Sequence, residues 1–225
     1  MATFLFDSIV FGPVSSRRLG VSLGINLLPV SRKVCSFNCI YCECGWTHGS
    51  KGRKEALPSR TEVYEALRKK LSEMKEQGKA PDVITYAGNG EPTMHPDFAS
   101  IIDDSVALRN EFFPEARISV LSNGSMLRRK SVRDALKKVD MNILKLDSAL
   151  PETVSRVNQP HAKTGLALFE KYVRDFEGSF IIQTLFVRGE CDGQPVDNTT
   201  EEEIAAWLGA LGRLRPRQVM IYTIH

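Results

Sequence analysis

The sequence has no long hydrophobic run and no strong excess of one charge. No apolar stretch approaches the roughly 18 residues that a membrane-spanning helix needs. Residues 1–12 lack the basic start and the cleavage-like end of a signal peptide. A net charge of +3 over 225 residues is too small to indicate a nucleic-acid-binding protein by itself. These absences predict a cytoplasmic protein without membrane association.

Cysteine is scarce outside one short stretch. Four of the five cysteines lie in residues 35–44, C-S-F-N-C-I-Y-C-E-C, and the fifth is Cys191. No second cysteine pair completes a zinc knuckle, and the four histidines show no paired metal-ligand spacing: His48, His95, His161 and His225. A reducing cytosol disfavours disulfides for such a cluster. The spacing therefore favours an iron–sulfur cluster, with structural zinc as the alternative.

Three thiolates on a four-iron cluster leave one iron without a protein ligand, and an open iron suggests catalysis. The pattern C-x3-C-x-aromatic-C, here Cys35, Cys39, Tyr41 and Cys42, resembles the signature of the radical S-adenosylmethionine superfamily. By that resemblance the three cysteines would hold a [4Fe-4S] cluster, and S-adenosylmethionine would chelate the fourth iron. Tyr41 would lie near the adenine. Cys44 is outside the motif and is expected to be a neighbour of the cluster, not a ligand.

Hydrophobic periodicity predicts six strands that alternate with helices. The strands are expected at residues 22–29, 82–88, 117–122, 142–147, 180–187 and 218–224. The helices are expected at residues 61–79, 96–113, 130–139, 151–158, 165–176 and 199–214. Short, nearly continuously apolar strands in this order predict an α/β fold with a parallel sheet covered by helices.

Periodicity alone is compatible with both an open barrel and a flat, doubly wound sheet. The resemblance implies the first, a partial (β/α)6 barrel. Composition, at 42% hydrophobic and 25% charged residues, fits one globular domain, and no repeat or linker divides the chain. We therefore predict a single domain over residues 1–225, with an N-terminal extension at 1–21 and a cluster-binding loop at 31–59.

Ligands of parallel α/β folds bind beyond the carboxyl ends of the strands. Gly88, Asn89, Gly90 and Glu91 follow the second predicted strand. Glycines let backbone approach a ligand closely, and a glutamate accepts hydrogen bonds from an ammonium group. Taken alone, the segment also fits a tight loop with a capping carboxylate. It resembles the superfamily's Gly-Gly-Glu-type motif, which holds the amino group of S-adenosylmethionine.

Two further strand ends carry polar residues. Ser122 and Asn123 end the third strand, where a simple Asn-Gly turn is an equal alternative to binding. Lys145 and Asp147 occupy alternate positions of the fourth strand, so they share one face and could pair with each other or contact a cofactor. The resemblance implies that these strand ends contact the ribose and the carboxylate of S-adenosylmethionine.

Other polar residues are weaker candidates. Gln183 and Tyr222 lie on the last two strands, and His95 precedes a proline at a helix start, which is typical of a turn residue. Basic residues near the cysteines are predicted to attract an anionic substrate or a reduced electron donor such as flavodoxin or ferredoxin: Arg17, Arg18, Arg32, Lys33, Lys51, Arg53 and Lys54. A second basic set is expected to form a solvated face: Arg128, Arg129, Lys130, Arg133, Lys137 and Lys138.

The resemblance implies a radical enzyme. A reduced cluster would pass one electron to S-adenosylmethionine, giving methionine and a 5′-deoxyadenosyl radical that abstracts hydrogen from a substrate. The segments F-G-P-V-S-S-R-R-L-G, G-N-G-E-P-T and K-L-D-S-A resemble the short iron–sulfur oxidoreductases similar to the radical domain of wyosine synthetase. Those synthetases use additional cysteines for a second cluster, whereas no cysteine precedes Cys35 in this sequence.

The sequence does not distinguish among three classes of substrate. A base of transfer RNA, a glycyl residue of a partner protein and a small metabolite are all compatible with it. The alternative from another class is an interaction module in which the cysteines hold structural zinc.

Overall fold

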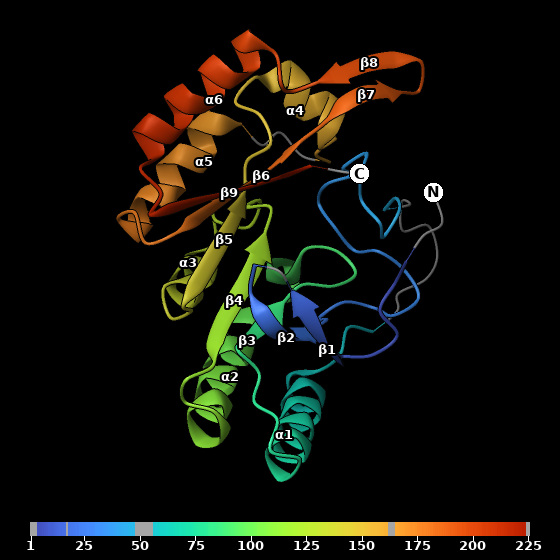
Figure 1. The fold of residues 1–225 in the computed structure, drawn as a ribbon, viewed down its shortest axis with the longest axis vertical. Coiled ribbons are helices and arrows are strands. Elements are labelled where there is room, and N and C mark those ends of the chain that lie inside the picture. The colour runs from blue at the N-terminus through green and yellow to red at the C-terminus, as the bar shows by residue number, and fades with distance from the viewer. Residues whose placement is uncertain (1–3, 17, 48–55, 162–164, 224–225) are drawn as a thin grey trace.

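Seven strands form one curled sheet in the part of the chain that the computed structural model describes, residues 4–16, 18–47, 56–161 and 165–223 (Figure 1). In sheet order they are β1 (Val10–Ser16), β2 (Gly20–Ile25), β3 (Val83–Tyr86), β4 (Arg117–Ser122), β5 (Met141–Lys145), β6 (Ile181–Phe186) and β9 (Gln218–Thr223). β1 runs antiparallel to β2, and every other neighbouring pair is parallel. The predicted α/β fold with a partial barrel is confirmed.

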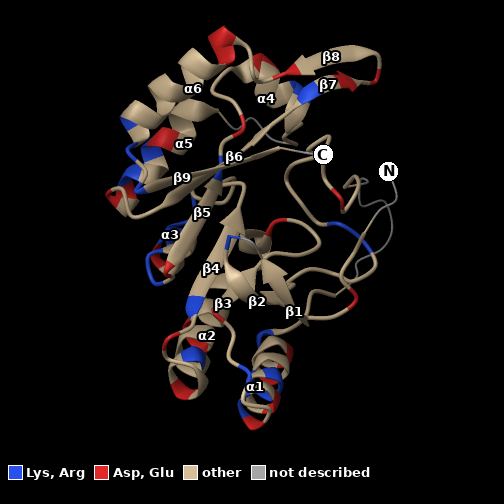
Figure 2. Cartoon of the chain, in the orientation of Figure 1, with Lys and Arg blue, Asp and Glu red and all other residues tan. Residues whose placement is uncertain are grey.

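The helices connect the strands and lie mainly outside the curve of the sheet (Figure 1). They are α1 (Arg60–Glu76), α2 (Phe98–Phe112), α3 (Lys130–Leu136), α4 (Pro151–Val157), α5 (Leu166–Val173) and α6 (Glu201–Leu214). α1 shows why they form, because its buried residues Val63, Leu67, Leu71 and Met74 recur at helical spacing. Charged residues gather on the helices and are sparse on the strands of the seven-stranded sheet (Figure 2).

The two faces of the sheet bury different apolar clusters. The larger one, which includes Ile84, Val120 and Leu144, packs between the sheet and the helices. The smaller one contains Met141, Ile143, Ile181 and Met220, with Leu19 and Leu121 packed against it. Leu19 comes from the turn between β1 and β2, so this hairpin contributes a side chain to the smaller cluster.

The structure adds strands that the sequence pattern did not predict. β1 is one of them, and β7 (Arg188–Cys191) and β8 (Gln194–Asp197) form a separate antiparallel hairpin. These segments are polar or largely exposed, so they carry no apolar run. The first parallel strand begins and ends earlier than predicted, at Gly20–Ile25 instead of residues 22–29. The chain leaves the sheet after Ile25 and turns toward the cysteines.

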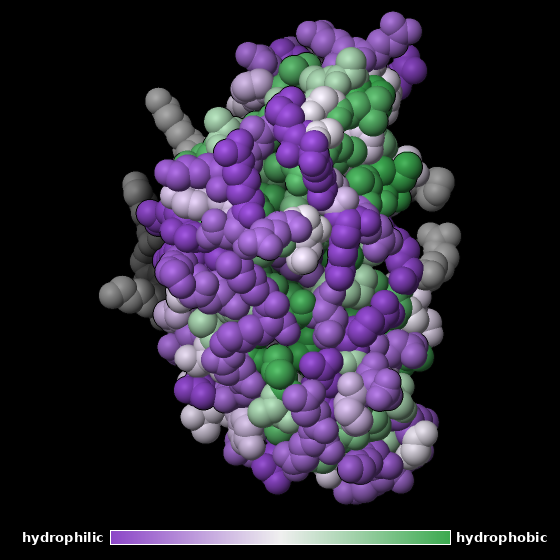
Figure 3. Space-filling model, turned by 90° about the vertical axis from the view of Figure 1, so that its left-hand side faces the viewer, coloured by the Kyte–Doolittle hydropathy of each residue, from purple (hydrophilic) through white to green (hydrophobic). Residues whose placement is uncertain are grey.

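Polar side chains dominate the side of the molecule seen in Figure 3, with apolar side chains in bands between them. Among the described residues, no helix combines the length and the apolar composition required to cross a bilayer.

Candidate cofactor-binding site

The loop between β2 and α1 passes the carboxyl ends of the strands and pairs with the segment after β3 (Figure 1). Val34 N–H donates to the Asn89 carbonyl at 2.8 Å, and Glu91 N–H donates to the Val34 carbonyl at 3.0 Å. Between these two bonds lies Gly90 at φ +138°, where a Cβ atom would stand 1.9 Å from the Val34 carbonyl oxygen. Only glycine permits this approach, which brings the cysteine loop against the Glu91 segment.

The thiols of Cys35, Cys39 and Cys42 are free and half-buried. Two side-chain amides from distant elements point at them. Asn123 Nδ2 lies 3.6 Å from Cys35 Sγ, and Asn158 Nδ2 lies 3.4 Å from Cys39 Sγ. N–H donors to sulfur are typical of the surroundings of thiolate ligands, where they help to set the reduction potential of the metal centre.

Within the described ranges, no three His, Cys, Asp or Glu side chains lie close enough to share a single metal ion. The Cys44 thiol donates to the Gly88 carbonyl at 3.5 Å, consistent with its predicted role as a neighbour.

Electrostatic conditions differ among the thiols. Burial and the nearby Glu91 carboxylate raise the pKa of Cys35 to about 12. A hydrogen bond with Cys44 and the positive charge of Lys33 lower the pKa of Cys42 to about 5. Lys33 is only 4% exposed, and its Nζ donates to the Gly45 carbonyl at 2.9 Å. Lys33, one of the basic residues predicted to attract a substrate or an electron donor, therefore lies buried with its ammonium inside the cysteine loop.

Glu91 joins the ends of β3 and β4. Its carboxylate is 2% exposed and accepts hydrogen bonds from Thr93 N–H at 3.1 Å, the Ser122 hydroxyl at 2.9 Å and Asn123 N–H at 2.6 Å. Burial raises the pKa of Glu91 even though these donors lower it. A buried carboxylate in this state gains from a positively charged partner. An ammonium group of a ligand is such a partner.

The side chain of Asn89 faces away from Glu91. It is fully buried, and its Nδ2 donates to the carbonyls of Phe6 and Pro29, both at 2.9 Å. Its Oδ1 accepts from Phe6 N–H at 2.9 Å. Asn89 thus contributes only backbone to the loop that includes Gly88, and its side chain anchors the N-terminal segment.

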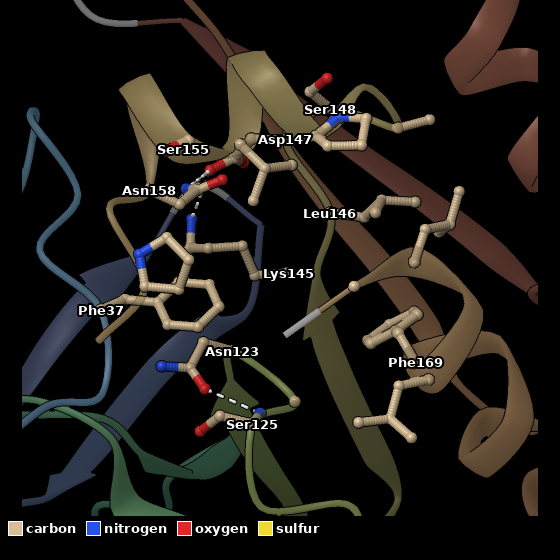
Figure 4. Close-up of a pocket in the computed structure, with 18 of the residues that line it drawn as sticks. Phe37, Asn123, Ser125, Lys145, Leu146, Asp147, Ser148, Ser155, Asn158 and Phe169 are labelled. Carbon is tan, nitrogen blue, oxygen red and sulfur yellow. Dashed lines mark hydrogen bonds and ion pairs between the residues drawn. The ribbon is translucent and has the colours of Figure 1, made fainter. Parts of the chain in front are cut away.

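Lys145, Asp147 and Asn158 lie together at the end of β5 (Figure 4). Tyr41 joins this polar group through its hydroxyl. Lys145 Nζ lies 2.6 Å from the Tyr41 hydroxyl and 3.4 Å from Asp147 Oδ2. The Tyr41 hydroxyl and Asn158 Nδ2 donate to the same carboxylate oxygen. Burial opposes the charge of Lys145, but Asp147 and Tyr222 outweigh it and raise the pKa of the lysine. Lys145 and Asp147 thus pair with each other, and their assignment as cofactor contacts stays a prediction.

A cavity of about 420 Å³ opens beside this group (Figure 4). Asn123, Lys145 and Asp147 form part of its wall, and Phe37 and Phe169 supply aromatic surface. The volume suits a small organic molecule.

A model of the radical SAM superfamily matches residues 31–192, from the cysteine loop to the β7–β8 hairpin. The chain belongs to the radical SAM superfamily. It is therefore an enzyme of the radical SAM class, a class for which a [4Fe-4S] cluster and S-adenosylmethionine are expected.

The chain is also similar in sequence to a curated protein and in fold to two solved structures. A UPF0026 protein of Helicobacter pylori is 33% identical over 188 residues, which cover 82% of this chain and 58% of that protein. The chain thus spans little more than half of that relative's length. SuiB of Streptococcus suis, crystallised with S-adenosylmethionine, shares the fold with a TM-score of 0.58 and 13% sequence identity. The match covers 90% of this chain and 38% of the SuiB chain. Archaeal TYW1 shares the fold with a TM-score of 0.52 and 13% sequence identity, and the match covers 86% of this chain and 61% of the TYW1 chain.

The residues of this radical SAM chain fit the cofactors of its superfamily. Three half-buried thiols share one loop with the ammonium of Lys33, and two amide donors face them. The Glu91 carboxylate lies next to that loop, and no ion pair of Glu91 is found among the described residues. The assignment of Gly88, Gly90, Ser122 and Asn123 as cofactor contacts stays a prediction.

The weaker sequence candidates have different surroundings. Gln183 is the register partner of Lys145 on β6, and the ring of Tyr222 lies 4.9 Å from the Arg18 guanidinium carbon. His95 Nε2 donates to the Pro58 carbonyl at 2.8 Å while Nδ1 accepts from Asp97 N–H, which is the structural turn role expected for it. Six basic or histidine positions of the predictions lie outside the described residues: Arg17, His48, Lys51, Arg53, Lys54 and His225.

The second basic set runs from just before α3 to just after it, and it includes the ion pairs of Arg133 with Asp175 at 2.6 Å and of Lys138 with Asp103 at 2.5 Å. Five of its six members are exposed, which agrees with the interpretation of a solvated face, whereas the side chain of Arg133 is only 13% exposed. Sequence reasoning missed Asn158, since nothing in its local pattern signals a contact with a cysteine 119 positions away.

Proposed function

We propose that this chain binds a [4Fe-4S] cluster through Cys35, Cys39 and Cys42 and acts as an iron–sulfur oxidoreductase. The observation that carries the proposal is the backbone pairing of the three-thiol loop with the Glu91 segment. When bound, the cluster and S-adenosylmethionine supply the reductive cleavage that yields methionine and the 5′-deoxyadenosyl radical, which takes hydrogen from a substrate.

The chain's own residues bind and orient the cofactor. Glu91 accepts hydrogen bonds from its amino group, and Ser122 and Asn123 hold that carboxylate in place. Lys145 and Asp147 bind the carboxylate and the ribose. The ion pair between Lys145 and Asp147 already holds both side chains in place, so cofactor binding costs little side-chain entropy.

Tyr41 lies near the adenine in this proposal. Its hydroxyl is tied to the Lys145–Asp147 pair, which sets the direction of the ring. Because the cavity adjoins this group, its polar wall is the proposed place of the adenosyl moiety, and its aromatic side around Phe169 is the proposed place of the substrate. Apolar walls exclude water from a reactive species.

The external partner in this proposal is a reduced flavodoxin or ferredoxin. The three thiols are only half-buried, so a donor protein can approach the loop that carries them. The substrate is a small metabolite, a nucleic-acid base or a residue of a partner protein. At 13% identity, the similarity to TYW1 and SuiB supports a shared fold but does not identify the substrate.

The test is formation of 5′-deoxyadenosine by protein reconstituted without oxygen, with dithionite and S-adenosylmethionine. We expect slow cleavage by the unmodified chain and a loss of at least about tenfold in Glu91→Ala, equivalent to about 1.4 kcal/mol of binding. Glu65→Ala, an exposed glutamate on α1, is the matched control and keeps the rate. A fully loaded cluster that yields no 5′-deoxyadenosine would contradict the proposal.

A further inference from the structure

A second segment, residues 157–161, also pairs with the cysteine loop. α4 ends at Val157, and the chain continues beside residues 36–40. Four backbone hydrogen bonds join them. Ile40 N–H donates to the Val157 carbonyl at 2.9 Å, Asn38 N–H donates to the carbonyls of Asn158 at 3.0 Å and Gln159 at 3.1 Å, and His161 N–H donates to the Ser36 carbonyl at 2.8 Å. The stretch that carries Cys39 is thus held from both sides, by this segment and by the Gly90 pairing.

The side chain of Asn158 points from this segment into the loop. It is 2% exposed, and its Nδ2 lies 3.4 Å from Cys39 Sγ and 2.6 Å from Asp147 Oδ2. A primary amide carries two N–H donors, so it serves both acceptors at once. Asp147 is itself fixed, because its Oδ1 accepts from Leu185 N–H at 2.9 Å. The orientation of Asn158 is therefore set by β5 and β6.

We propose that Asn158 is a positioning residue that directs the Cys39 thiolate and raises the reduction potential of the cluster. The proposal rests on the proposed cluster site at Cys35, Cys39 and Cys42. An N–H donor to a ligating sulfur stabilises the more negative, reduced state of the cluster. Asn158 also connects that sulfur to Asp147, so one buried amide links the proposed cluster site with the proposed cofactor site.

The experiment compares the reduction potential of the reconstituted protein in two variants, Asn158→Leu and Asn142→Leu. Asn142 is the matched control, since it is 1% exposed on β5 and its amide has no hydrogen-bond partner among the described residues. Asn158→Leu is expected to lower the equilibrium constant for reduction about tenfold, a shift of about 59 mV to more negative potential. Asn142→Leu is expected to keep the unmodified value.

The outcomes separate this inference from the proposed function. If the unmodified chain binds no iron, the cluster site itself is wrong. If it binds iron and Asn158→Leu has an unchanged potential, the role of Asn158 is overturned.

Asn158→Ser is measured in parallel, because its hydroxyl is too short to reach the sulfur and serine is tolerated at a helix end. An unchanged potential in either variant that binds iron overturns the inference. If Asn158→Leu and Asn158→Ser fold but bind no iron, while Asn142→Leu binds iron, the positioning role of Asn158 is supported.

Discussion

The ion pair of Lys145 and Asp147 is the residue-level contact with the largest expected effect on stability. The side chain of Lys145 is 18% exposed and that of Asp147 is fully buried. Removing one partner of a buried pair leaves the other charge uncompensated and costs about 3–5 kcal/mol. We expect Lys145→Met to lower the free energy of unfolding of the metal-free chain by about that amount, measured in urea.

The double variant Lys145→Met with Asp147→Asn is the control, and it should recover much of the loss because no unpaired charge remains. A loss below about 1 kcal/mol in the single variant would contradict the pairing. The pH dependence has a defined sign. The pKa of Lys145 is raised, so its contribution is fully present below the usual value of 10.5 and is lost as pH rises through the raised pKa.

Gly90 sets how closely the cysteine loop approaches the Glu91 segment. A Cβ atom at this position meets the Val34 carbonyl oxygen at 1.9 Å, and the backbone has φ +138°. We therefore expect Gly90→Ala to displace the loop and to abolish most iron binding, measured as iron per chain after reconstitution.

Gly212→Ala is the control for Gly90→Ala. Gly212 lies in α6, where an added Cβ meets nothing within 4 Å, so the substitution should raise stability by up to about 1 kcal/mol and leave iron binding intact. Full iron loading of Gly90→Ala would show that the Val34–Gly90 pairing is not required.

Much of the candidate site could be predicted from the sequence at this scale. The cysteine spacing and the Gly90-Glu91 motif are local patterns, and the structure brings Glu91, Ser122 and Asn123 into contact as strand ends of a parallel sheet must. Lys33 and Asn158 could not be predicted. Their roles depend on where the loop folds back and where α4 ends, and neither is encoded in local spacing.

The N-terminal segment is the element whose position depends most on one side chain. The backbone N–H and carbonyl of Phe6 form two hydrogen bonds with the side-chain amide of Asn89. Phe4 N–H donates to the Glu43 carbonyl of the cysteine loop at 2.8 Å. The rings of Phe6 and Phe11 stack with centroids 3.6 Å apart. Asn89, which differs from the common Gly-Gly-Glu form, thus anchors this segment against the loop.

Asn89→Gly should release residues 4–11. The lost side-chain bonds contribute about 1 kcal/mol each, so amide hydrogen exchange in this segment should become at least about tenfold faster. Mass spectrometry of exchanged peptides measures this change, with the peptide that covers β4 as the internal reference. Unchanged exchange in residues 4–11 would show that the aromatic packing holds the segment without Asn89.

The elements differ in how far their sequences specify them. The central parallel strands β3, β4 and β6 are apolar runs buried largely on both faces, so periodicity located them, and β9 was located by its apolar residues although it is mostly exposed. β1 contains Pro13 and is mostly exposed, and the β7–β8 hairpin is polar, so the same criterion missed both. Their stability depends on pairing with a neighbouring strand, which a local pattern does not describe.

At the scale of the whole molecule, the fold gives an open half-barrel with the cysteine loop along the strand ends. The choice between this shape and a flat sheet came from the family resemblance, because alternating strands and helices fit both. The chain covers 58% of the length of the Helicobacter pylori relative. The identity of the substrate therefore belongs to the proposed function.

The central claim is that Cys35, Cys39 and Cys42 hold one four-iron cluster. The most direct measurement is iron and sulfide per chain after anaerobic reconstitution of the five single Cys→Ala variants. We predict about four irons and four sulfides in the unmodified chain, in Cys44→Ala and in Cys191→Ala, and severe loss in the variants of Cys35, Cys39 and Cys42. Zinc without iron in the unmodified chain, or full loading of any of the last three variants, would contradict the account.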